Sequence, residues 1–445
     1  MAVSKLLASR VATTALWPAL LCVFVYPGTS LADRPLSLSD AVRTALANHE
    51  DAEIALLRLK QAEARERQSL ARLFPQLDAR ASVVYLPETT SQVGDLGVIE
   101  SESTTYTTGS ADLTVDLVNL GALVDYMSAP DRTKAQHFAT QETRRKLAFG
   151  VARQFLTVLA TEQVRVAAQN RLDVAALTVT QAQQRFEAGV GRASDVTRAE
   201  LEKASAQSAQ IGSDRDALLE GLNLMQLLAV PKKSAGVGDL QPPGSSLIDF
   251  DWRAEALSGD ALDSRLDLKR ARLLADVASE SIRENLAGFL PTLSAGATVS
   301  KSDDGVVERD FQWSVGLNLR WSIYAGGSRW AEDDYRTAET RATDLWVSKL
   351  TRSIGHDVQV AQQRLEASLQ EVQQAKVQAE LAEKNGKQTA AMFEHGLATA
   401  LERVDAIANT FSAQANLVGR TLETRLAELA LLEALGRWPT GGTAP

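Results

Sequence analysis

The sequence of 445 residues is poor in the residue types that most enzymes and metal proteins use for their chemistry. Its only cysteine, Cys22, leaves no possible disulfide within the chain. The four histidines stand far apart, without the spacing of metal ligands, and neither a glycine-rich phosphate loop nor a nucleophile motif is present. We therefore expect no enzyme, no catalytic residue, no metal site and no cofactor.

Basic charge is also scarce. The chain has 47 lysines and arginines against 56 acidic residues, which gives a net charge of -9. A nucleic-acid-binding protein needs a basic surface to neutralise phosphates, so this class is excluded. The apolar content of 45% is nevertheless ample for a folded, buried core.

The N-terminus has the pattern of a secretory signal peptide. Lys5 and Arg10 precede a short apolar run over residues 16–26, and small residues follow it, so we expect residues 1–32 to be removed. Cys22 lies inside the apolar run, which leaves the mature chain without a thiol. A lipid anchor at Cys22 is the alternative.

Beyond this segment no stretch is apolar enough for a membrane-spanning helix, but four segments alternate strictly between apolar and polar residues. They are "LDARASVVY" (77–85), "ADLTVDL" (111–117), "LSAGATV" (293–299) and "FQWSVGLNLRWSI" (311–323). A period of two predicts strands with one apolar and one polar face. A soluble, half-buried sheet would give the same pattern.

Aromatic residues and strand length favour a membrane β-barrel over a soluble sheet. The aromatic residues expected at the membrane interface are Tyr85, Tyr106, Trp313, Trp321 and Tyr324. Four strands cannot close a barrel, and an open edge in lipid leaves backbone groups unpaired. The chain must therefore oligomerise if these strands span a membrane.

The remaining sequence is rich in alanine, glutamine, glutamate, arginine and leucine, which predicts long helices. We expect helices over residues 37–73, about 125–188, 194–229, 262–288, 328–395 and 400–436. The proline- and glycine-rich stretch "PKKSAGVGDLQPPGSS" (231–246) is predicted to join two halves at the surface.

The chain is a tandem duplication. "LFPQLDARASV" (73–83) matches "FLPTLSAGATV" (289–299), and "FEAGVGRA" (186–193) matches "FEHGLATA" (393–400). The predicted units are residues 33–230 and 262–438, each with a strand hairpin (about 77–118 and 292–323) and a long helical hairpin (tips near 189–195 and 396–402). Residues 231–261 form a mixed connection between them, and residues 439–445 form a C-terminal tail.

The two Phe-Glu-x-Gly motifs mark sharp corners between long helices. About 72 and 73 residues separate the second strand of each half from its corner, or roughly 105 to 110 Å of helix, so both corners are predicted at one height. Glycine ends one helix, and Thr399 with Glu402 forms a capping box that starts the next.

These residues resemble the TolC-like outer-membrane efflux family, the outer-membrane factors of tripartite efflux or type I secretion systems. The resemblance covers essentially the whole mature chain and rests on "LSLSDAVRTALANHE" (36–50), "LFPQL", "FLPTL", "LVNLG" (117–121), "SIYAGG" (322–327) and the two corners. It implies a homotrimer with twelve strands in one transmembrane β-barrel, continued by a long periplasmic α-helical barrel. Such a protein resides in the lipid of the bacterial outer membrane and is a passive exit duct.

The resemblance also implies partners and sites. The helical tips dock to a periplasmic adaptor, which is served by an inner-membrane pump or a secretion ATPase. Adaptor docking falls on Gly189, Val190, Gly191, Gly396, Leu397 and Ala398. The matching positions for an acidic pore constriction are Glu402 and Asp405, with Asp195 as a gate-associated acid. Glu402 is equally well explained as the acid of the capping box.

The sequence departs from the family at the gate. Phe393 and Ala398 replace a bridging tyrosine and arginine, so the usual partners of Asp195 are missing and Arg192 could supply another contact. The alternative function is a periplasmic coiled-coil scaffold or adaptor without a pore. The cargo, whether drug, metal ion or polypeptide, is not encoded in these motifs.

Overall fold

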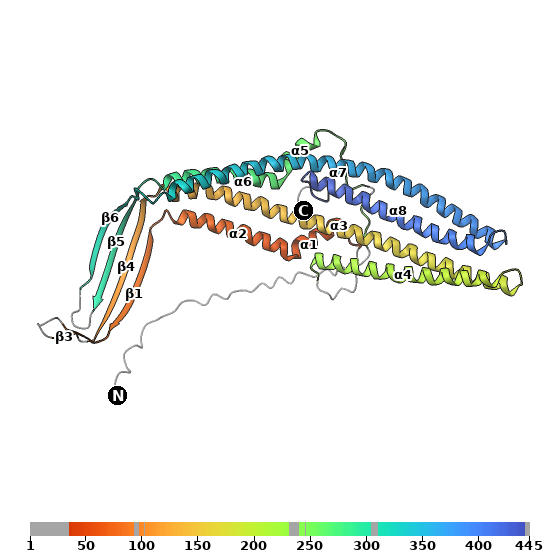
Figure 1. The fold of residues 1–445 in the computed structure, drawn as a ribbon, viewed down its shortest axis with the longest axis horizontal. Helices are drawn as coiled ribbons and strands as arrows, with labels where there is room; N and C mark the ends of the chain where they lie inside the picture. Colours follow the sequence, from red (N-terminus) through yellow and green to blue (C-terminus); the bar gives the residue numbers. More distant parts are fainter. Residues whose placement is uncertain are drawn as a thin grey trace, which may run out of the picture.

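The computed structural model describes residues 35–92, 98–101, 103–230, 240–244, 246–303 and 310–440. Long helices run side by side from a sheet at one end of the molecule to two tight corners at the other (Figure 1). The predicted signal peptide, Cys22, residues 231–239 of the connection and the end of the tail lie outside the described residues.

The four alternating segments form one antiparallel sheet, as predicted. Its strands are β1 (Gln76–Leu86), β4 (Thr104–Val118), β5 (Thr292–Asp303) and β6 (Gln312–Arg320), in the order β1-β4-β5-β6. A separate pair of strands, β2 (Thr89–Gln92) and β3 (Val98–Ser101), follows β1 and precedes β4 in the sequence. This pair was not predicted. β4 also begins earlier than the strict alternation at Ala111, because threonines at its start favour the strand.

The strand register brings the apolar sets onto one face. Ala79 pairs with Ala111, Ala111 with Val299, and Val299 with Trp313, so one row crosses all four strands. Because directly paired residues share a face, the alternating apolar residues of the four strands lie on the same side of the sheet.

Eight helices are described. They are α1 (Leu38–Asn48), α2 (Glu50–Ala71), α3 (Leu120–Glu187), α4 (Ala193–Leu228), α5 (Leu257–Ser264), α6 (Leu266–Ala287), α7 (Ser328–Glu394) and α8 (Ala400–Ala434). α3 has 68 residues and α7 has 67, so each is about 100 Å long at 1.5 Å per residue. α2 and α4 pack along α3, and α6 and α8 pack along α7 (Figure 1).

Two predicted helices are each interrupted. The helix expected over 37–73 breaks at His49, whose backbone is extended (ψ 134°) and whose Nδ1 accepts a hydrogen bond from the Asp51 N–H at 3.1 Å. His49 therefore caps α2, which the periodicity alone did not indicate. The helix expected over 262–288 is interrupted near its start. α5 ends before Arg265 and α6 begins after it, because the backbone of Arg265 is also extended.

α3 begins at Leu120, before the predicted start near 125. The side chain of Asn119 accepts a hydrogen bond from the Ala122 N–H at 3.0 Å and so caps the helix. Pro130 lies within α3, where its ring removes one backbone donor.

The apolar core sits at mid-length, where α1 and α5 cover the junction of the long helices. One cluster includes Phe149, Phe155, Leu224 and Leu429, all fully buried, and a second includes Ile354, Leu365 and Leu431. A bridge between Leu36 and Leu240 joins the start of the described chain to the connection between the halves.

Of the helices in the described part of the chain, none has the length and apolar character needed to cross a membrane.

Candidate functional site

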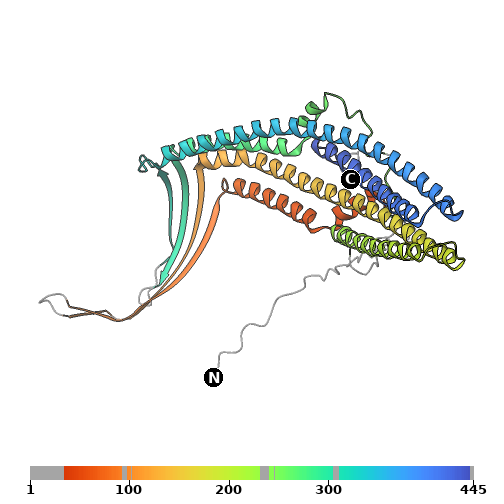
Figure 2. The same cartoon turned by 45° about the vertical axis from the view of Figure 1, so that its right-hand side comes forward.

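The two corners lie together at the end of the molecule farthest from the sheet (Figure 2). The first corner joins α3 to α4, and the second joins α7 to α8. Both corners contain glycine and both expose an apolar residue.

The first corner ends α3 with a Schellman motif. Gly189 has φ of +75°, its N–H donates to the Phe186 carbonyl at 3.0 Å, and the Val190 N–H donates to the Arg185 carbonyl at 3.0 Å. A Cβ on Gly191 would lie 2.9 Å from the Phe186 nitrogen, so this position also requires glycine. Val190 is 70% exposed at the apex.

The second corner repeats this geometry. Gly396 has φ of +78°, its N–H donates to the Phe393 carbonyl at 3.0 Å, and the Leu397 N–H donates to the Met392 carbonyl at 2.7 Å. Leu397 is 79% exposed at the apex. The duplicated sequence motif therefore encodes a duplicated helix end with an apolar residue at the same position.

The capping box predicted after the second corner is present. The Glu402 carboxylate accepts hydrogen bonds from the Thr399 N–H at 2.7 Å and from its hydroxyl at 2.9 Å, and the Glu402 N–H donates back to that hydroxyl at 3.2 Å. These bonds, first the one from the backbone, hold the pKa of Glu402 below its ordinary value. Glu402 is therefore a carboxylate at neutral pH.

Asp405 lies one turn after Glu402 on α8, and both side chains are exposed. On α4, Asp195 accepts a hydrogen bond from the Arg192 N–H at 3.3 Å, so Arg192 contacts this acid through its backbone. The structure thus puts two exposed carboxylates after the second corner and one half-buried carboxylate after the first.

The residues that depart from the family pattern are buried in apolar packing. Phe393 is 3% exposed and forms a small cluster with Ala398 and Ala400. Ala398 is therefore part of the folded corner itself, whereas Leu397 beside it is exposed. The second corner is therefore consolidated by apolar contacts among these residues.

An interaction that was not predicted fastens the two corners to each other. Arg185, in the last turn of α3, donates from Nη1 to the Phe393 carbonyl of α7 at 2.7 Å. Its guanidinium lies over the Phe393 ring, 5.0 Å from the centroid, and its Nη2 lies 3.3 Å from where a Cβ on Gly396 would be. One arginine thus holds the ends of both long helices.

The sheet presents a second functional surface. Its apolar face is uncovered within the described chain: Val83, Trp313, Val315 and Leu317 are each at least 70% exposed. So large a continuous apolar surface marks an interaction with lipid or with another chain. Tyr85 lies on this face, at the end of β1 away from the helices.

The strand register decides the face of the sheet on which Tyr106 lies. Tyr106 pairs with Val84, so it lies on the opposite face from Tyr85. That face carries polar contacts, including Arg80 with Asp112 at 3.2 Å and the Thr298 hydroxyl with Asp112 at 2.8 Å. The alternation pattern could not assign Tyr106 to a face of the sheet, because the alternating segment begins only at residue 111.

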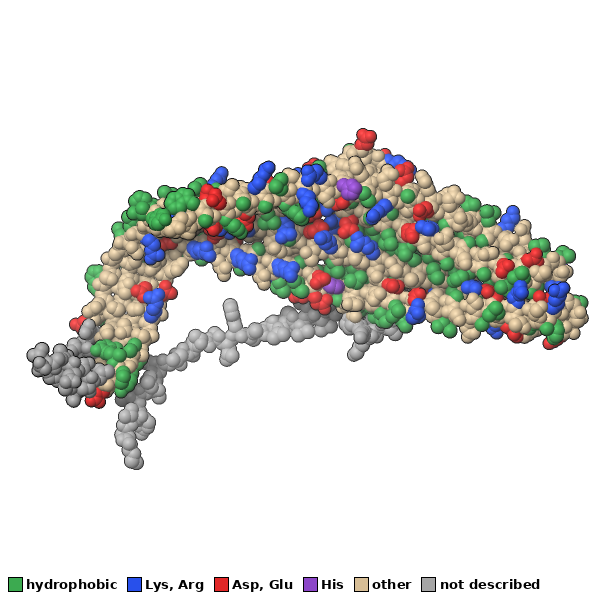
Figure 3. Space-filling view, viewed as in Figure 1, with side chains coloured by type: hydrophobic (Ala, Val, Ile, Leu, Met, Phe, Trp, Pro, Cys, Tyr) green, Lys and Arg blue, Asp and Glu red, His purple; other side chains and the backbone are tan. Residues whose placement is uncertain are grey.

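Trp321 and Tyr324 lie where the sheet meets the helices. The Trp321 indole donates to the Phe289 carbonyl at 3.1 Å, Phe289 stacks edge-on against Trp330 at 5.9 Å, and Tyr324 contacts Trp330 at 6.4 Å. Apolar side chains gather on the surface over this junction (Figure 3). Trp321 and Tyr324 are thus grouped with Phe289 and Trp330 at the end of the strands next to the helices.

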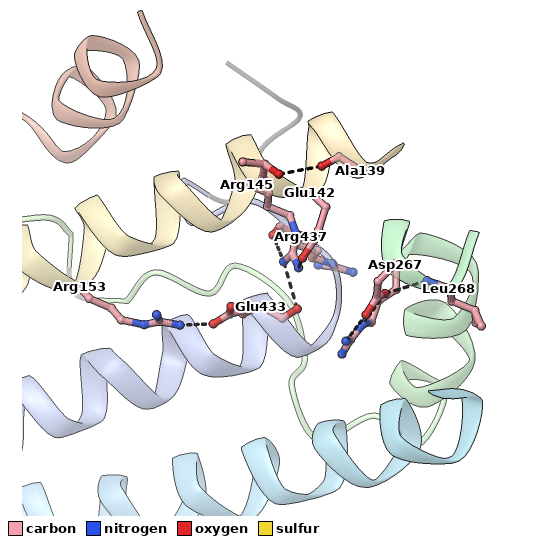
Figure 4. Close-up of polar contacts among 10 residues, drawn as sticks. Ala139, Glu142, Arg145, Arg153, Asp267, Leu268, Glu433 and Arg437 are labelled. Atoms are coloured by element: carbon pink, nitrogen blue, oxygen red, sulfur yellow. Dashed lines mark hydrogen bonds and ion pairs between the residues drawn. The ribbon is translucent and has the colours of Figure 1, made fainter. Parts of the chain in front are cut away.

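At mid-length, Arg145 of α3 binds the C-terminal end of α8 (Figure 4). It donates to the carbonyls of Glu433 at 3.1 Å and Arg437 at 3.4 Å, and it pairs with Glu142 at 2.9 Å. Arg153 adds an ion pair to the Glu433 carboxylate. These contacts join the first half of the chain to the end of the second.

Arg265 and Asp267 form a paired site in the same region, with Arg265 Nη2 2.6 Å from the Asp267 carboxylate. Burial by itself would raise the pKa of Asp267, but the hydrogen bonds and charge of Arg265 outweigh burial and leave the pKa below its ordinary value. Among the described residues, no group of His, Cys, Asp or Glu side chains is arranged to hold a metal ion.

The sequence matches the family model described as "Outer membrane efflux protein" twice, over residues 41–230 and 257–437. It is 26% identical over 419 residues to the toluene efflux pump outer membrane protein TtgC of Pseudomonas putida, covering 90% of this chain and 83% of that protein. It is also 26% identical over 421 residues to the pyoverdine export outer membrane protein OpmQ of Pseudomonas aeruginosa, covering 90% and 85%.

Solved structures show the same fold. The crystal structure of CusC, described for its folding and transmembrane channel formation, aligns with a TM-score of 0.77 at 17% identity, over 90% of this chain and 92% of that chain. The two separate matches of the family model fall on the two halves of the chain, each of which contains strands of the sheet and one helical hairpin that ends in a corner.

Proposed function

The chain belongs to the outer membrane efflux protein family, and from this premise we propose that it is the exit duct of a tripartite efflux or type I secretion system. In this role it conducts cargo passively from a periplasmic adaptor, served by an inner-membrane pump, to the exterior. The observation that carries the proposal is the shared apolar face of the four strands, joined to the long helices α3 and α7, which run to one pair of linked corners.

The free edges of the sheet support assembly into the proposed homotrimer. β1 and β6 are its outer strands, and their free edges in lipid need partners. Three copies of the four-stranded sheet supply twelve strands, which is within the range of outer-membrane barrels.

α4 supplies a matching helical contact. It exposes a stripe of large apolar residues with coiled-coil spacing, namely Leu201, Ile211, Leu218 and Leu222. We assign this stripe, the α4 stripe, to contact with the neighbouring copy. In the trimer, lipid then covers the apolar face of the strands, and the neighbouring copy covers the apolar stripe of α4.

The corners are the proposed adaptor site. Val190 and Leu397 stand at the two apexes, where glycine-containing turns expose them, and apolar tips of this kind suit contact with another helical hairpin. Gly189, Gly191 and Gly396 shape the turns, while Ala398 packs beneath the second one.

We assign the pore constriction to Glu402 and Asp405, with Asp195 beside it. Three copies of the two acids on α8 would form acidic rings, which favour cations in a narrow pore. The capping role of Glu402 is compatible with this assignment, because its carboxylate remains exposed and charged while it accepts the bonds from Thr399.

The test is membrane fractionation of cells producing the full chain, followed by planar-bilayer recording of the detergent-extracted oligomer. We expect outer-membrane localisation, a trimer and a small, steady current. Release by osmotic shock as a soluble oligomer without current would instead establish a periplasmic scaffold. Leu218→Glu on the α4 stripe should prevent trimer formation, whereas the same change at an exposed polar position of α4, Gln207→Glu, should not.

A further inference from the structure

Arg403, near the start of α8, is a buried cation without an acidic partner. It is 8% exposed, its Nη1 donates to the Gly386 carbonyl at 3.0 Å, and its Nε has no hydrogen-bond partner. No carboxylate of the described residues forms an ion pair with it. Its cationic neighbours differ: Arg171 pairs with Glu202 at 2.9 Å, and Lys387 pairs with Glu383 at 2.5 Å.

Arg403 lines a pocket of about 230 Å³ between α3, α7 and α8. Val174, Ile407 and Phe411 make much of its wall apolar, and Arg171 lies over the Phe411 ring at 5.0 Å. The volume is below the roughly 300–1,000 Å³ of sites for drug-sized ligands, so it suits a small molecule.

A buried, unpaired charge is costly unless a counter-ion reaches it. Burial lowers the pKa of Arg403, which shows the same cost, although an arginine stays protonated at neutral pH. Since only one cation of the pocket lacks a partner, a monoanion would balance the charge. The apolar part of the wall favours an anion with an apolar body over a strongly hydrated ion such as phosphate.

We propose that this pocket, the Arg403 pocket, binds a small amphiphilic carboxylate, whose charged group pairs with Arg403 and whose apolar body contacts Val174, Ile407 and Phe411. The ligand would touch α3 of the first hairpin and both helices of the second. Its binding therefore ties the two hairpins together a few turns above the corners.

The test is calorimetric titration of the detergent-purified oligomer with benzoate, and with benzamide as a neutral analogue of the same shape. We expect saturable binding of benzoate, little binding of benzamide, and a higher unfolding temperature with benzoate. Arg403→Gln, which keeps a donor for Gly386 but removes the charge, should weaken benzoate binding about tenfold or more. Arg420→Gln, an exposed arginine of α8 outside the pocket, is the matched control.

A second variant protects the test against misfolding at Arg403. Ala390→Leu keeps the charge but fills the pocket that Ala390 lines, and it should abolish binding. The proposal is overturned if wild type does not bind benzoate, if benzamide binds equally well, or if both pocket variants bind benzoate as wild type does. Channel current measured on the same samples reports separately on the exit-duct function.

Discussion

Arg185 of α3 and Phe393 of α7 are joined by a hydrogen bond of 2.7 Å and by stacking of the guanidinium on the ring at 5.0 Å. The two residues belong to different halves of the duplicated chain and lie at the two corners. Because Phe393 is buried and Arg185 reaches it through its backbone carbonyl as well as its ring, the contact fixes the spacing of the helix ends.

Loss of this link should loosen the corners. We expect Arg185→Ala to increase the single-channel conductance, because the first hairpin is then free to move away from the second. Arg198→Ala, an exposed arginine of α4, is the control and should leave the current unchanged. Equal currents for Arg185→Ala and wild type would show that the corner spacing does not limit the pore.

Neutralising the acids after the second corner tests the constriction. The pair Glu402→Gln and Asp405→Asn should raise conductance and lower the permeability ratio of cations to anions by roughly half or more. Glutamine at position 402 can still complete the capping box, so the change removes charge while sparing the fold. An unchanged ratio, like that expected for Glu200→Gln on α4, would place the constriction elsewhere.

The cap itself has a separate effect on stability. Thr399→Ala removes the hydroxyl that accepts the Glu402 N–H, and it should destabilise α8 by about 1 kcal/mol, measured as a lower unfolding temperature of the purified oligomer. Thr399→Ser retains the hydroxyl and should remain near wild type. If serine and alanine destabilise equally, the hydrogen bond is not what stabilises this helix end.

α7 and α8 pack closely at Gly386. A Cβ there would lie 2.9 Å from the Thr410 hydroxyl, so Gly386→Ala should destabilise by about 1–2 kcal/mol. Gly355→Ala on the same helix has open space and should stabilise by about 0.5–1 kcal/mol. Adding Thr410→Ala to Gly386→Ala should recover part of the loss; additive losses in this double-mutant cycle would contradict the steric explanation.

Acid should weaken the mid-length junction through Asp267. Its pKa is lowered in the folded state, so the unfolded chain binds this proton more tightly. The stability it contributes is present above its ordinary pKa of 3.8 and is lost as pH falls through the folded-state pKa. Unfolding temperatures recorded from about pH 6 to about pH 3 should fall less steeply for Asp267→Asn than for wild type. Asp263→Asn, exposed on α5, should keep the wild-type slope.

Much of the fold was predictable because the strands alternate apolar and polar residues and the helix ends carry glycine motifs that are visible in the local sequence. The alternation at Leu293 to Val299 specifies a strand with one apolar face, and the glycines of the two corners specify left-handed helix ends. The cap at Thr399 was predictable as well, because a capping box depends only on residues three positions apart.

The missed features depend on contacts that periodicity does not contain. Arg185 and Phe393 are 208 positions apart, so no local pattern relates them. The break at His49 depends on one side chain capping the next helix within an otherwise helical composition. Tyr106 was placed with Tyr85 because both are aromatic and close to strand ends, whereas pairing with Val84 decides its face.

The near-equal lengths of α3 and α7, 68 and 67 residues, constrain how such a chain can evolve. One extra heptad in a single half would shift its corner by about 10 Å and carry Arg185 out of reach of Phe393. Insertions and deletions in these helices must therefore occur in both copies together. The two halves of the duplicated gene can then change in length only by the same number of codons.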